Sequence, residues 1–103
     1  MYAVQVGPKL LGETRTEPID VSSQLGPSDT LVSASATCAV YSGTDANPSA
    51  VVGACTVDTT FNMVNVPLTG GVVGCIYQIV VTVVLNTGNK YFTFFLVVTP
   101  DAV

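Results

Sequence analysis

Residues 75–98 carry the pattern that most constrains the fold, because they form two apolar runs separated by a short polar turn. Both runs, CIYQIVVTVVL and YFTFFLVV, place apolar side chains at every second position, which is the period of a β-strand and not of a helix. The sequence NTGN at residues 86–89 suits the reversal between them. The pattern predicts a long β-hairpin with one buried face, made of Cys75, Tyr77, Ile79, Val81, Val83, Leu85, Phe92, Phe94, Leu96 and Val98.

The rest of the chain also has the character of an all-β protein. Val, Thr, Ile, Tyr and Phe dominate, turn-forming residues recur every 8 to 12 positions as in sandwiches and barrels, and no stretch keeps helical spacing. Residues 30–41, TLVSASATCAVY, predict a half-buried strand with Val32, Ala34, Ala36, Cys38 and Val40 on one face. Residues 12–23, with a break at Pro18, and residues 50–58 and 61–68 predict further strands.

At 103 residues, the chain has the length of a single domain, residues 1–103. We predict an immunoglobulin-like β-sandwich of about six to seven antiparallel strands, with residues 1–12 as an extended arm. Tyr77 stands near the start of the penultimate strand, where that fold has a tyrosine whose hydroxyl bonds to backbone upstream. Cys38 and Cys75 fall on the second and penultimate strands, but Cys75 precedes Tyr77 and no tryptophan is present, so the prediction is immunoglobulin-like only in the broad sense.

The charge and the missing residue types exclude several classes of function. Charged residues make up 10% of the chain and the net charge is −4, which repels phosphate and argues against nucleic-acid binding. There is no histidine, the commonest general base and metal ligand. Lys9 and Lys90 could act as bases but are expected to be solvated, so we predict no enzyme activity, no catalytic residues and no cofactor.

Metal binding, redox chemistry and membrane insertion are not expected either. Three cysteines without a CxxC pair indicate reduced, buried thiols. Asp45 and Asn47 have a D-x-N spacing, but a turn leading into Pro48 explains them better than a calcium site does. The most apolar stretch has 11 residues, against about 20 for a membrane helix, and we identify no signal peptide.

The second face of the hairpin is unusually apolar. Tyr91, Phe95 and Val97 lie on it, and the neighbouring strand adds Ile76, Val80 and Val84. Either the amino-terminal segment YAVQV or a long loop covers this face, or it is a protein–protein interface. The loop VYSGTDANPSAVV, residues 40–52, is expected to connect two strands and to contact a neighbouring subunit. The candidate interface residues are Tyr41, Asp45, Asn47, Tyr91, Phe95 and Val97.

A resemblance adds to this interpretation. The segments GETRT, IDV, DTLVSA, VYSGTDANPSA and GGVVGCIYQI, followed by NTGN, occur in that order along nearly the whole chain. In this arrangement the sequence resembles small virion-associated structural proteins of tailed bacteriophages and prophages. The resemblance implies a non-enzymatic module of the virion, assembled in the cytoplasm of the bacterial host, that binds other virion proteins of the capsid, neck or tail. A homo-oligomer is also compatible with it.

Three functions are therefore expected in order. The first is capsid decoration, in which the protein binds the major capsid protein as a cement. The second is a component of the neck, the head–tail junction or the tail. The third is a carbohydrate-binding or host-attachment module, for which Tyr2, Tyr41 and Tyr91 are the aromatic residues available.

Overall fold

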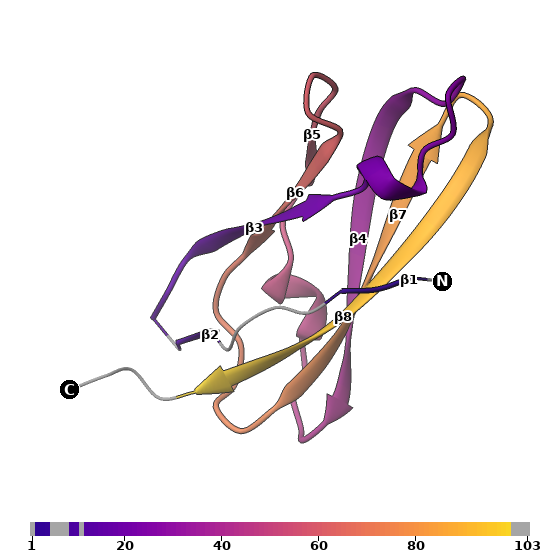
Figure 1. Ribbon diagram of the computed structural model, residues 1–103. Helices are drawn as coiled ribbons and strands as arrows, with labels where there is room; N and C mark the ends of the chain where they lie inside the picture. Colours follow the sequence, from indigo (N-terminus) through magenta and orange to yellow (C-terminus); the bar gives the residue numbers. More distant parts are fainter. Residues whose placement is uncertain (1, 5–8, 11, 100–103) are drawn as a thin grey trace.

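The computed structural model describes residues 2–4, 9–10 and 12–99, and within them the protein is all-β with no α-helix (Figure 1). Two short 3-10 turns interrupt the strands. The strands are β1 (Tyr2–Val4), β2 (Lys9–Leu10), β3 (Arg15–Asp20), β4 (Leu31–Ser42), β5 (Thr56–Asp58), β6 (Met63–Leu68), β7 (Ile76–Leu85) and β8 (Gly88–Thr99), and the 3-10 turns are η1 (Ser22–Gln24) and η2 (Pro48–Val51).

Six of these strands form two three-stranded antiparallel sheets. The large sheet has the order β8-β7-β4 and the small sheet the order β3-β6-β5. The short strands β1 and β2 add to the large sheet by pairing in parallel with β8. The side chains between the two sheets form the hydrophobic core, to which β3, β6, β7 and β8 contribute most of the fully buried residues.

The predicted hairpin is confirmed. Strands β7 and β8 pair from Ile76 opposite Val97 to Leu85 opposite Gly88. All ten side chains predicted to be buried on the two strands are buried. Tyr77 and Phe94 are the largest apolar side chains of the hairpin with no exposed surface. The strict alternation in the sequence thus fixes which face of the large sheet meets the small sheet.

Strand β4 is half-buried as predicted, with one exception. Val32 was expected on the inner face, but its side chain is 56% exposed. A β-bulge between Leu31 and Ser33 inserts one extra residue, so the inner face shifts to Leu31 and resumes at Ala34. Periodicity alone does not reveal such an insertion.

The strand predicted for residues 50–58 is much shorter than expected, and this prediction was wrong. Pro48 begins the turn η2, which includes Ala50, and the strand β5 starts only at Thr56. Proline is well suited to the first position of a helical turn because its φ is already fixed. The predicted break at Pro18 is also absent, since β3 runs through it as an edge strand, where a missing N–H is tolerated.

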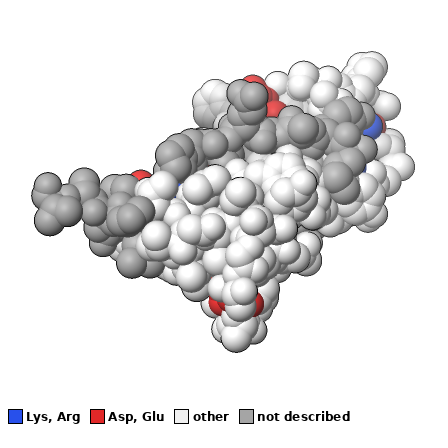
Figure 2. All heavy atoms as spheres, turned by 90° about the horizontal axis from the view of Figure 1, so that it is seen from below, with Lys and Arg blue, Asp and Glu red and all other residues white. Residues whose placement is uncertain are grey.

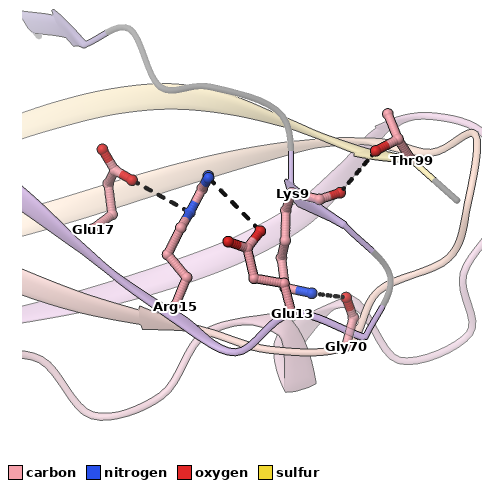
Figure 3. A network of polar contacts seen from close by, with 6 residues as sticks. All are labelled: Lys9, Glu13, Arg15, Glu17, Gly70 and Thr99. Atoms are coloured by element: carbon pink, nitrogen blue, oxygen red, sulfur yellow. Dashed lines mark hydrogen bonds and ion pairs between the residues drawn. The ribbon is translucent and has the colours of Figure 1, made fainter. Parts of the chain in front are cut away.

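Residues 1–12 were predicted to form an extended arm, and the described part of this segment pairs with the large sheet. Strand β1 runs beside Phe92–Phe94 and β2 beside Val98–Thr99, whereas residues 1, 5–8 and 11 lie outside the described residues. Lys9 is fully buried, which contradicts the expectation that it is solvated. Its Nζ donates to the backbone oxygen of Gly70 at 2.9 Å, close to the ion pairs that Arg15 makes (Figure 3).

Candidate interaction surface

The outer face of the large sheet carries a small patch of exposed apolar side chains. Tyr41 is 65% exposed, Phe95 44% and Val97 40%, and the half-buried Ile76 stands directly opposite Val97. The rings of Tyr41 and Phe95 pack edge to face, with centroids 4.8 Å apart and an interplanar angle of 67°. We call these four residues, Tyr41, Ile76, Phe95 and Val97, the outer patch.

The outer patch joins the three neighbouring strands of the large sheet. Tyr41 stands at the bulge near the end of β4, Ile76 begins β7, and Phe95 and Val97 lie near the end of β8. Edge-to-face packing holds the two aromatic rings together before any partner arrives, so less side-chain entropy is lost on binding. The structure therefore brings together three of the six candidate residues predicted from the sequence.

Tyr91 lies outside the outer patch. It is 45% exposed on the same strand and face as Phe95, but four residues away, or about 13 Å along a strand. Between them, on the same face, lies Thr93, which is 6% exposed and pairs with Ala3 of β1. Tyr91 and the outer patch are thus two separate exposed sites on one sheet.

Asp45 connects the loop at residues 40–52 to the core through a hydrogen bond. The buried Tyr77 hydroxyl donates to its Oδ2 at 2.7 Å, and the Asn47 backbone N–H donates to its Oδ1 at 2.9 Å. The same hydroxyl accepts a bond from the Val72 N–H at 2.7 Å, which is the predicted bond to upstream backbone. The turn at Asp45–Asn47 is the predicted Asx turn, and the Asn47 side chain accepts a bond from Ser49.

The cysteines are free thiols inside or beside the core. Cys75 donates from its Sγ to the Thr44 backbone oxygen at 3.4 Å, a second tie to the loop. Burial, together with the charge of Asp45, raises the pKa of the Cys38 thiol to about 11, which makes it a poor nucleophile at neutral pH. In the described part of the chain, no three His, Cys, Asp or Glu residues come together as metal ligands would.

Hydrogen bonds to three aspartates predict how the stability of the protein depends on pH. Side-chain hydroxyl groups donate to Asp20, Asp29 and Asp45, and these bonds hold the three pKa values below the ordinary value of 3.8. The donor to Asp45 is Tyr77. The unfolded chain therefore binds protons first, and the free energy of unfolding should fall as the pH drops from about 5 through 3. Urea denaturation at a series of pH values measures this fall. In Asp45→Asn, the free energy of unfolding should fall less steeply with decreasing pH. A free energy of unfolding that stays constant down to about pH 3 would contradict the lowered pKa values.

Charge is sparse on the surface. Figure 2 shows a face dominated by uncharged residues, with acidic groups at its margins. No helix in the described residues is long and apolar enough to cross a membrane. A surface of this kind gives little electrostatic steering, so recognition must depend on shape and apolar contact.

A family model described as "Podophage GP4 fiber-tail adaptor protein gp77" matches residues 9–98 of the chain. No curated protein and no solved structure matches the chain. The family match supports a structural protein of a tailed phage that interacts with other virion proteins, as the sequence resemblance implied. It agrees with the tail-associated alternative better than with capsid decoration, the function expected first. Because the match spans most of the sequence, the chain belongs to the gp77 family of podophage GP4 fiber-tail adaptor proteins.

Proposed function

We propose that the protein is a non-enzymatic adaptor of the phage virion that joins a tail fibre to the tail. The observation that carries this proposal is the family match over residues 9–98. An adaptor needs surfaces for two partners and no chemistry of its own, which agrees with a chain that lacks histidine. Assembly in the host cytoplasm, where thiols stay reduced, suits the three free cysteines.

The outer patch is the surface that we assign to one of the two partners. Interfaces derive most of their binding energy from a few aromatic anchors surrounded by less important contacts. Tyr41 and Phe95 are two exposed aromatic rings already in contact, with the apolar Val97 on the same strand as Phe95. Asp45 and Asn47 contribute indirectly, because their hydrogen bonds order the loop that follows Tyr41.

We infer that the fold is the immunoglobulin-like sandwich that the sequence predicts, which suits this role. Strands β3-β6-β5 facing β4-β7-β8 follow the order B-E-D facing C-F-G in that fold. The bond from the Val72 N–H to Tyr77 is in keeping with its tyrosine corner. Such a rigid sandwich presents one sheet face and the loops at its ends to partners.

A binding measurement tests the proposal. The purified protein should bind the purified tail-fibre protein or tail protein of the same phage, measured by calorimetry. The double variant Tyr41→Ala, Phe95→Ala should weaken binding to one of them at least about 30-fold, as expected for an anchor pair at the centre of an interface.

Phe61→Ala is the matched control for that variant. Phe61 is 71% exposed in the turn between β5 and β6, in the other sheet, and its loss should change affinity less than about 3-fold. Tyr91→Ala tests how far along β8 the interface extends. If the wild type and the double variant bind both partners with equal affinity, the outer patch is not a binding surface. If the wild type binds neither partner, the adaptor function itself is overturned.

A further inference from the structure

Strand β4 forms an open edge of the large sheet. It has 12 residues and pairs on one side only, with β7. In an antiparallel pair, every second residue turns its N–H and C=O away from the neighbouring strand. Among the residues that the structure describes, no hydrogen bond reaches the outward-facing backbone groups of β4.

Nothing in the sequence of β4 protects this edge. Edge strands usually carry charged residues, proline or strong bulges that prevent pairing with another chain. Residues 31–42 contain no charged residue and no proline, and the two bulges lie at the ends of the strand. The regular stretch from Ser33 to Val40 is therefore a template for a further strand.

The hydrophobic core is also incompletely covered along this same side. Eight hydrophobic residues pack against the core while remaining partly exposed, and all but Leu25 lie on β4 or on the segment from Val52 to Val57 that passes beside it: Ala34, Ala36, Cys38, Val40, Val52, Cys55 and Val57. The core residues of β6, β7 and β8, in contrast, are fully buried. A strand added beside β4 would cover the partly exposed side chains with its inward-facing residues.

We propose that the β4 edge binds an extended, uncharged segment of a partner virion protein, which adds to the large sheet as a further strand. Its inward side chains, at every second position, are apolar and cover the partly exposed core residues beside β4. Backbone hydrogen bonds provide the affinity, and the apolar positions provide the specificity. This inference rests on the proposed adaptor function, since it describes how one of the two partners is held.

A partner segment fits this edge better than a second copy of the same strand. In a β4-to-β4 pair, the second copy would present the same inner face, which is Ala34, Ala36, Cys38 and Val40, so that three of its four side chains are small. Side chains as small as alanine would bury little of the partly exposed Val52 and Val57. Larger apolar side chains are needed there.

Hydrogen exchange at the β4 amides tests the proposal on the unaltered chain. In the free protein, alternate amides between Ser33 and Val40 should exchange quickly, because they point away from β7. On addition of the purified fibre protein or tail protein, these amides should slow by about 100-fold. Protection by either partner supports the proposal. Binding without added protection on β4 would overturn it and leave the adaptor function intact, and binding to neither would overturn both.

A pair of lysine variants gives a second measurement. Ala36→Lys places a charge on the inner face, where an added strand would bury it, and should weaken binding at least about 10-fold. Ser35→Lys puts the same charge on the outward face of the same strand and should change affinity less than about 3-fold. Thermal melts of both variants check that they still fold. Protection of the β4 amides already in the free protein, together with a dimer in solution, would assign the edge to a second copy and contradict the proposal.

Discussion

Tyr77→Ala is expected to lower the free energy of unfolding by about 3–5 kcal/mol, the range measured when a large buried aromatic side chain is removed from a core. Tyr77 has no exposed surface and lies on the hairpin face that meets the small sheet, near the end of the hairpin that is opposite its turn. It also bonds to both Asp45 and the Val72 backbone. A loss of this size is a large part of the 5–15 kcal/mol that holds a typical domain folded. Urea denaturation followed by circular dichroism measures it.

Tyr77→Phe separates the hydroxyl from the ring. The ring still fills its place in the core, so the expected loss is only about 1–2 kcal/mol, for the two hydrogen bonds. The acid sensitivity that Asp45 contributes should weaken at the same time, because the donor that lowers its pKa is gone. Tyr91→Phe is the control, since that tyrosine is 45% exposed and should cost nothing measurable. A Tyr77→Phe variant as stable as wild type would show that the hydrogen bonds of the hydroxyl do not stabilise the loop.

Gly43→Ala is expected to cost about 2–4 kcal/mol, for two separate reasons. Gly43 has a φ of +102°, in the region that side chains rarely adopt. In addition, a Cβ placed there would stand 2.7 Å from the Sγ of Cys75 and 3.1 Å from its Cα. The loop would have to move away from β7, which would loosen the contacts of Thr44 and Asp45.

Gly74→Ala is the matched control for this clash. Gly74 has a similar φ of +87°, but a Cβ there meets nothing within 4 Å. It should therefore show the backbone cost alone, about 1–2 kcal/mol. The difference between the two variants measures the steric contribution, which Cys75→Ala should reduce. Equal losses for Gly43→Ala and Gly74→Ala would mean that the loop does not pack tightly on β7.

The parts of this fold that could be predicted from the sequence are those with strict local periodicity. The buried face of residues 75–98 follows from alternation alone, and apolar residues of both parities in β8 already indicate the exposed Phe95 and Val97. The bulge that exposes Val32 leaves no trace in periodicity. The turn η2 at Pro48 replaced a strand because a proline start outweighed the β-propensity of the valines that follow.

Hydrogen bonds between residues far apart in the sequence could not be predicted from local patterns. Asp45 and Tyr77 are 32 residues apart, and only the three-dimensional structure shows that Asp45 connects the loop to the core. Lys9 was expected to be exposed to solvent because lysine side chains usually are. Its Nζ instead donates a hydrogen bond to the backbone oxygen of Gly70, which is 61 residues away in the sequence. An apolar patch has the same chemistry on a capsid protein and on a tail protein, so the sequence pattern favoured an interface without distinguishing the two.

Cryo-electron microscopy of purified phage particles is the sharpest test of the adaptor function, since it locates the protein in the virion. We predict that the two-sheet domain lies at the junction between the tail and its fibres. There, the outer patch and the β4 edge should face neighbouring proteins. Density for the domain on the capsid lattice, or its absence from the junction, would contradict the adaptor function.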